Sequence, residues 1–218
     1  MSFCFRSLPI ARVVACVAAV FCPIPATLAD ALPAVQAIVN QISQTQYEGY
    51  HLTVENMGLG LYGGASYNMG YRNRQGAAGP GSLGNQETRL YLQDTLAGMG
   101  LGVSTQGTSY NVIGELPGVV NPDQVIIVSA HYDRVSGDRP GGDDNASGTA
   151  GMLEVARVLS QYPFGATIRF VGFNAEENGL LGSKDYVSNY VVPNGESIVA
   201  VLNMDIRAKR RKPADMLA

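Results

Sequence analysis

Cysteine and histidine are scarce in this chain of 218 residues. The cysteines, Cys4, Cys16 and Cys22, all lie near the N-terminus, and the only histidines are His51 and His131. If the N-terminal segment is removed, the remaining chain has no disulfide and no thiolate ligand. Any metal ion that it binds must therefore be held by histidine and carboxylate side chains.

Long hydrophobic runs are also lacking. The N-terminal apolar run, residues 13–22, is too short to span a bilayer. It follows Arg6 and Arg12 and precedes an A-x-A pattern at Ala29–Ala31, so residues 1–31 are typical of a secretory signal peptide. We therefore expect a secreted or periplasmic protein with no stable membrane insertion after signal removal.

Charged residues make up only 15% of the chain, and their signs are unevenly distributed. Residues 32–206 carry sixteen acidic and eight basic side chains, whereas residues 207–212 contain five bases. With 46% hydrophobic residues, the composition is that of a globular domain large enough to bury a core. The acidic body argues against a nucleic-acid partner.

Strands and helices alternate along most of the chain, which predicts an α/β fold. Helices are expected at 33–44, 85–99, 147–160 and 181–189, the third capped by Ser147, and strands at 103–108, 110–116, 125–128, 167–173 and 197–204. The run at 125–128 is continuously apolar and the runs at 167–173 and 197–204 are largely apolar, so we expect these three strands to be buried on both faces. Glycine-rich residues 57–84 predict a long loop. The expected fold class is a mixed, largely parallel sheet with helices on both faces.

Polar side chains follow each of the three apolar strands. They are His131 and Asp133 after the first, Glu176 and Glu177 after the second, and Asp205 after the third, with Asp143 and Asp144 in a glycine-rich loop. If these strands are parallel neighbours, their carboxyl ends bring the polar residues into one crevice. Crowded carboxylates repel one another, and a divalent cation compensates that repulsion. One histidine with several carboxylates favours zinc, with manganese or cobalt as alternatives.

Four segments in order carry a family resemblance: "SAHYDRVSG", "PGGDDNASGTAGMLEVARVL", "IRFVGFNAEENGLLGSKDYV" and "VAVLNMD". Over residues 85–205 the chain resembles the M28 family of zinc aminopeptidases. The resemblance implies the zinc aminopeptidase (phosphorylase/hydrolase-like) sheet and two zinc ions at the strand ends. It also implies hydrolysis of the N-terminal peptide bond of a peptide or protein substrate with a free N-terminus.

The resemblance also implies roles for individual residues. His131 corresponds to the histidine ligand of one zinc ion, with Asp133 behind it, and Asp205 completes that site. Asp143 corresponds to the aspartate that bridges both metals. Glu177 corresponds to a ligand of the other zinc ion, and Glu176 to the general base that takes a proton from the attacking water.

The chain departs from the family pattern after residue 206. The family's second histidine ligand has no counterpart downstream of His131, and His51 is the only substitute in the chain. The set His131, Asp143 and Asp205 would still suffice for a single zinc ion. We therefore expect a metallopeptidase domain at 32–206 that is incomplete at its C-terminus, with an anomalous basic tail at 207–218.

A frameshift or premature stop after Ile206 would explain this departure. Such a chain would expose a sheet edge, and we expect it to be unstable and poorly active. A genuine short protein with a basic tail is the competing interpretation. Two alternative functions stay open: a glutaminyl cyclase or carboxypeptidase on the same scaffold, or an inactive metal-binding fragment.

Overall fold

The computed structural model describes residues 27–57, 82–135 and 141–205, without the side chains of residues 27–32. The chain divides into two units, residues 1–41 and 42–218. In the first unit, helix α2 spans Thr27–Val39, so it begins and ends earlier than the expected helix at 33–44. No helix within the described residues is both long enough and apolar enough to cross a membrane. The signal segment up to residue 26 and the basic tail lie outside the described residues, as does most of the expected glycine-rich loop.

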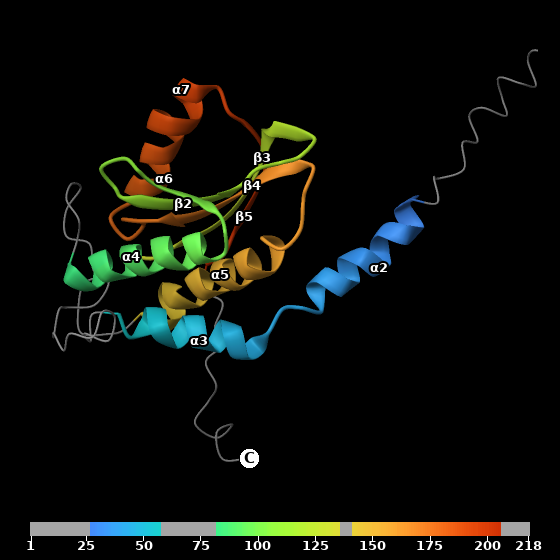
Figure 1. The fold of residues 1–218 in the computed structure, drawn as a ribbon. Coiled ribbons are helices and arrows are strands. Elements are labelled where there is room, and N and C mark those ends of the chain that lie inside the picture. Colours follow the sequence, from blue (N-terminus) through green and yellow to red (C-terminus); the bar gives the residue numbers. More distant parts are fainter. Residues whose placement is uncertain (1–26, 58–81, 136–140, 206–218) are drawn as a thin grey trace, which may run out of the picture. The chain divides into compact units, whose positions relative to one another are not determined.

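The second unit is built on a five-stranded mixed sheet with the strand order β1-β2-β4-β3-β5 (Figure 1). The strands are β1 (Gly102–Gln106), β2 (Asn111–Leu116), β3 (Asn121–His131), β4 (Ala166–Phe173) and β5 (Ser197–Asn203). β1 pairs with β2, and β2 with β4, in antiparallel fashion, whereas β3 is parallel to both β4 and β5. The expected mixed α/β sheet is confirmed, and its parallel part is the three strands that precede the polar residues.

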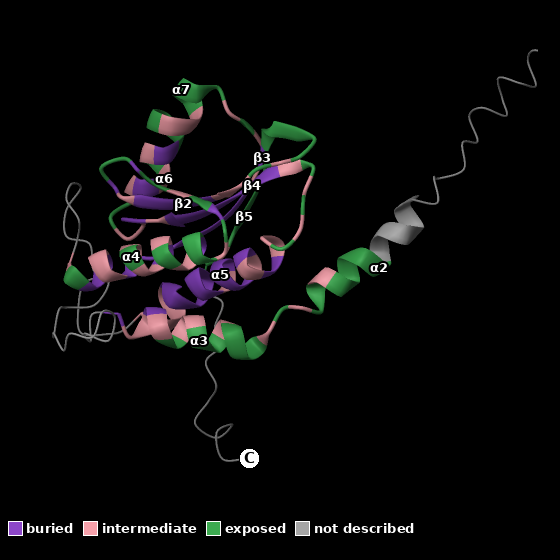
Figure 2. Ribbon diagram, viewed as in Figure 1, coloured by how far each residue is buried: buried purple, intermediate pink, exposed green. Residues whose placement is uncertain are grey.

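Helices lie on both faces of this sheet. On one face are α4 (Leu83–Gly98) and α5 (Ser147–Leu159), with α3 (Gln44–Glu55) against α5, as Figure 1 shows. On the other face lie α6 (Leu181–Tyr186), the turn η3 (Val187–Val191) and α7 (Val192–Asn194). Figure 2 shows that α5 and the central strands form the most buried part of this unit.

The side chains of β3 point alternately to the two faces of the sheet, which explains why both faces are covered by helices. Val128 and Ala130 pack into the core cluster with Leu92 of α4 and Leu153 of α5. Val125 and Ile127 point to the opposite face, into a second cluster that includes a tyrosine of α6. Successive side chains of a strand point to opposite faces, so a continuously apolar strand is stable only between two layers.

β5 differs from the expectation of a third buried strand. Val199, Val201 and Leu202 are 51%, 58% and 55% exposed. In the part of the chain that the structure describes, β5 pairs only with β3 and forms the edge of the sheet. An apolar sequence predicts what a strand can bury, but it does not supply the neighbours that would bury it.

Two helix starts also differ from the sequence prediction. Ser147 is the first residue of α5 rather than its cap, and its hydroxyl donates to the carbonyl oxygen of Asp143 at 2.7 Å. α3 was not expected; it begins after Ser43, whose hydroxyl accepts from the N–H of Gln46 at 3.3 Å. α4 agrees better with the prediction and begins at Leu83, after the N-cap Ser82.

Candidate metal centre

The ends of the three parallel strands bring the polar residues together. His131 is the last residue of β3, and its register partner on β4 is Phe173, three residues before Glu176. On the other side, β3 pairs with Asn203, two residues before Asp205. Because the three strands run in the same direction and end at the same level, one histidine faces acidic residues from both neighbouring strands.

His131 has acidic groups on both of its ring nitrogens. Nδ1 lies 3.2 Å from the backbone oxygen of Asp133 and 3.5 Å from its Oδ1. Nε2 lies 3.2 Å from Oδ1 of Asp144 and 3.6 Å from Oδ1 of Asp205. A carbonyl oxygen can only accept, so Nδ1 carries the hydrogen that is donated to Asp133. Nε2 is thereby directed at the two carboxylates, which is the arrangement of a histidine that ligates metal.

Asp133 connects this histidine to the turn after β4. Its side chain is fully buried, and its two carboxylate oxygens accept from the backbone N–H groups of Glu176 and Glu177 at 3.1 and 3.3 Å. One buried carboxylate therefore fixes both the ring of His131 and the backbone that carries the two glutamates.

Two groups of side chains have ligand atoms within 4.8 Å of one another: His131 with Asp144 and Asp205, and His131 with Glu176 and Glu177. Asp143, the expected bridging residue, belongs to neither group; its neighbour Asp144 lies beside His131 instead. Within the described structure, buried oxygens of Asp143 (Oδ1) and Glu177 (Oε1) have no hydrogen-bond partner. A buried carboxylate oxygen without a donor is costly, and a bound cation would satisfy it. The donor set therefore fits a divalent metal ion.

The charges of this cluster shift the protonation of its members. Burial acts to lower the pKa of His131, but the hydrogen bond and charge of Asp133, with the charges of Glu176 and Asp144, raise it to about 9. Burial raises the pKa of Glu176; the charge of His131 opposes this rise, and nearby aspartates add to it. Burial and the charge of Asp144 likewise raise the pKa of Glu177. Negative charge contributes to all three shifts, and a bound cation would neutralise that charge.

A buried asparagine cluster supports the glutamate turn from behind, and sequence reasoning missed it. Asn85 and Asn174 exchange side-chain hydrogen bonds of 2.9 and 3.1 Å, and the side-chain oxygen of Asn111 accepts from the N–H of Asn174 at 3.1 Å. A Cβ at Gly182 would lie 2.0 Å from the backbone oxygen of Asn174, so α6 packs directly on this cluster. The "NAEEN" stretch contained Asn174, but its partners are distant in the sequence.

His51 lies on α3 and is in neither group of candidate ligands. Its Nε2 is 2.8 Å from the backbone oxygen of Gly142, the first residue of the turn η2 (Gly142–Ala146) that carries the two aspartates. The idea that His51 replaces a missing histidine ligand therefore finds no support in this geometry.

An apolar cavity of about 460 Å³ adjoins the candidate centre. His131, Glu176 and Asp205 line its polar end. Its other walls come from β3, β4, β5, α6 and η3 and include Phe173, Tyr186, Val191, Ile198 and Val201. A small apolar group could thus be held beside the acidic cluster.

The fold and the site define an α/β protein with a candidate metal centre at the carboxyl ends of parallel strands. Residues 111–217 match the model of peptidase family M28.

Relatives of this part of the chain are named as peptidases. Aminopeptidase YwaD of Bacillus subtilis is 46% identical over 105 residues, which are 48% of this chain and 23% of that protein. A probable zinc metalloprotease of Pyrenophora teres f. teres is 36% identical over 102 residues, 44% of this chain and 22% of that protein. The chain thus spans less than a quarter of the length of these two relatives. Their names do not favour the cyclase or carboxypeptidase alternative.

The fold is similar to that of a solved aminopeptidase structure. The LapA aminopeptidase of Legionella pneumophila superposes with a TM-score of 0.66 at 20% identity, over 82% of this chain and 47% of that chain. At this level of identity the similarity concerns the fold alone, and it supports the expected zinc aminopeptidase type of sheet.

Proposed function

We propose that this chain is a zinc-dependent aminopeptidase domain that hydrolyses N-terminal peptide bonds. The observation that carries the proposal is the placement of His131 among acidic side chains from three parallel strand ends, with a buried Glu177 oxygen that has no donor in the described structure. The match of residues 111–217 to the model of peptidase family M28 and the names of the relatives support the same activity.

In this proposal one zinc ion is held by His131, Asp144 and Asp205, whose ligand atoms lie near one another. The bridging role expected for Asp143 passes to Asp144, because Asp144 faces Nε2 of His131. Glu177 is the candidate ligand of a second zinc ion. Three protein ligands with room for a further group are typical of catalytic zinc.

Glu176 and Asp133 have the remaining roles in this proposal. Bound zinc would lower the pKa of a water molecule and polarise the substrate carbonyl. Glu176 is the general base, and its raised pKa brings it closer to the pH at which a base both accepts and releases a proton. Asp133 holds the tautomer of His131 and the backbone of Glu176, so it acts through these residues rather than on the substrate.

The substrate is a peptide or protein with a free N-terminus. The adjoining cavity favours an apolar first side chain, because its walls beyond the acidic end are aliphatic and aromatic. The amino group of such a peptide is positively charged, and the carboxylates of Glu176 and Asp205 that line the cavity would attract it.

Replacing the proposed base tests this function. We expect Glu176→Gln to keep zinc affinity within about 3-fold of the wild type while it lowers hydrolysis of leucine p-nitroanilide at least about 100-fold. Glu48→Gln, at an exposed position of α3, is the matched control. A wild-type chain that does not bind Zn²⁺, or a Glu176→Gln variant that hydrolyses the substrate at the wild-type rate, would contradict the proposal.

Export is the remaining part of the proposal. Arg6, Arg12 and the apolar run at 13–22 support a secretory signal, and cleavage within 29–31 would give a secreted or periplasmic protein. N-terminal sequencing of the protein recovered from outside the cytoplasm would reveal the cleavage site. An uncleaved N-terminus on cytoplasmic protein would contradict export.

A further inference from the structure

The aspartate-bearing turn η2 is held from two sides. On one side, the side-chain N–H of Asn145 donates to the backbone oxygen of Met204 at 3.0 Å, next to Asp205. On the other side, Nε2 of His51 lies 2.8 Å from the backbone oxygen of Gly142. Asp144 stands between these two anchors, so its position relative to His131 depends on both of them.

The α3 side of this arrangement is closely fitted. A Cβ at Gly142 would lie 2.5 Å from Oε1 of Glu55, so the side chain of Glu55 on α3 reaches the turn. The ring of His51 stacks on Tyr47, with centroids 6.1 Å apart and planes 13° from parallel. The carbonyl of Gly142 can only accept, so Nε2 of His51 carries the hydrogen of this bond.

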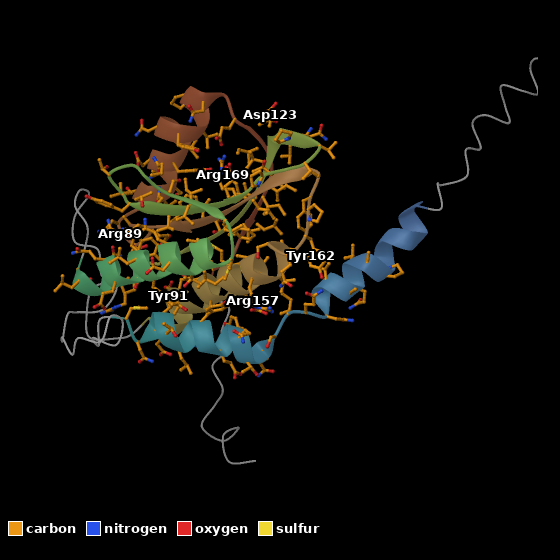
Figure 3. The ribbon with its side chains drawn as sticks, in the orientation of Figure 1. Arg89, Tyr91, Asp123, Arg157, Tyr162 and Arg169 are labelled. Atoms are coloured by element: carbon orange, nitrogen blue, oxygen red, sulfur yellow. The ribbon has the colours of Figure 1, made fainter. Side chains whose placement is uncertain are left out.

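The other end of α3 is fastened to the same helix that follows η2. The backbone N–H of Ser43 donates to Oε1 of Glu154 on α5 at 2.6 Å, and Arg157 binds both oxygens of that carboxylate at 2.6 and 2.8 Å. Figure 3 labels Arg157 where α5 faces α3. α3 is thereby held at its start by α5, and its later part presents His51 to the turn.

We propose that His51 is a positioning residue for the metal centre: through its hydrogen bond to Gly142 it holds the turn so that Asp144 faces His131. This inference rests on the proposed function. The side chain of Asp144 is 47% exposed, so its place beside His131 depends on how the turn that carries it is held. Groups that orient metal ligands typically change metal affinity 10- to 100-fold when they are removed.

Three alternatives make different demands on residue 51. If the hydrogen bond matters, a residue with a donor but no aromatic ring should suffice. If the stack on Tyr47 matters, an aromatic ring without a donor should suffice. If His51 were itself a zinc ligand, neither glutamine nor phenylalanine would replace it well.

The experiment measures the affinity of the metal-free full chain for Zn²⁺ alone, by competition with a chromophoric chelator. We expect His51→Phe to weaken binding about 10-fold and His51→Gln to remain within about 3-fold of the wild type. Gln44→Ala removes a hydrogen bond from Gln44 to Glu48 on the same helix, away from the turn, and should leave affinity unchanged. The thermal unfolding temperatures of the metal-free variants should agree within a few degrees.

Wild-type affinity in His51→Phe would overturn the inference, as would a His51→Gln variant as weak as His51→Phe. If His51→Phe does not fold, His51→Ala removes the same donor and should also weaken Zn²⁺ binding; unchanged binding in that variant would overturn the inference as well. A wild-type chain that does not bind Zn²⁺ would instead reject the proposed function, so the two failures are distinguishable.

Discussion

Replacement of Asp133 by asparagine should damage the metal centre without removing a ligand. The carboxylate accepts from two backbone N–H groups, those of Glu176 and Glu177, and Nδ1 of His131 lies 3.5 Å from it. Asparagine has nearly the same size but offers only one acceptor oxygen, and its NH₂ group cannot accept. One of the two N–H groups would therefore face a donor in a fully buried site.

Two effects of Asp133→Asn oppose each other. Loss of a hydrogen bond to a charged group costs about 1.5–3 kcal/mol. Removal of the charge also relieves repulsion, because Asp133 contributes to the raised pKa of Glu176 and Glu177, but it removes the attraction by which Asp133 raises the pKa of His131. Both glutamates are partly exposed, so solvent screens that gain and the loss is larger. We expect the free energy of unfolding of the metal-free chain to fall by about 1–2 kcal/mol.

Zinc affinity should fall further than stability, by about 10- to 100-fold, because the ring of His131 and the turn of Glu177 lose a common support. Urea denaturation followed by circular dichroism gives the free energy of unfolding, and chelator competition gives the affinity for Zn²⁺. Asp123→Asn, at an exposed position near the start of β3 (Figure 3), is the matched control. If Asp133→Asn matches this control in both measurements, the supporting role of Asp133 is wrong.

Three further predictions concern parts of the structure away from the metal ligands. Gly182→Ala should destabilise the chain by about 3 kcal/mol in urea denaturation, because the new methyl group would overlap the backbone of Asn174; unchanged stability would contradict the packing. Burial acts to raise the pKa of Glu154, but hydrogen bonds from Arg157 and Ser43 with the charge of Arg157 lower it overall, so its stabilisation is present above about pH 4.5 and is lost as pH falls through the lowered value. Glu154→Gln should remove that part of the acid dependence of the unfolding temperature, and an unaltered pH profile would refute it. Val199→Lys should reduce concentration-dependent association in light scattering, because a charged side chain opposes the pairing of an exposed apolar edge strand with another chain. If the variant and the wild type associate equally, β5 is not the surface through which chains associate.

The convergence of the polar residues followed from the sequence because it depends on local patterns. Three apolar runs, each followed by His131, Glu176 or Asp205, indicated strand ends, and parallel pairing placed those ends on one edge of the sheet. The presence of each strand and its place along the sequence can be recognised from a few consecutive residues. The burial of β5 was predicted wrongly, because burial depends on neighbours rather than on the strand itself.

The identity of the aspartate beside His131 could not be obtained from composition. Asp143 and Asp144 are adjacent, chemically identical and both within a glycine-rich turn. The backbone of Asp144, at φ −115° and ψ 98°, is not helical, and this local path decides which carboxylate points at His131. Similarly, Asn85 and Asn174 are 89 residues apart, so no local pattern pairs them.

The two halves of the candidate centre differ in how firmly the fold holds them. His131 and Asp133 are 4% and 0% exposed, and buried hydrogen bonds fix them, whereas the side chains of Asp144 and Asp205 are 47% and 49% exposed. An exposed carboxylate remains hydrated when no cation is present, so the side chains of Asp144 and Asp205 are held less firmly than those of His131 and Asp133. Metal affinity then depends on the free-energy cost of ordering the side chains of Asp144 and Asp205 when the metal binds. The distant anchors of that half, from His51 to Gly142 and from Asn145 to Met204, therefore matter to binding although none of these groups is among the candidate ligands.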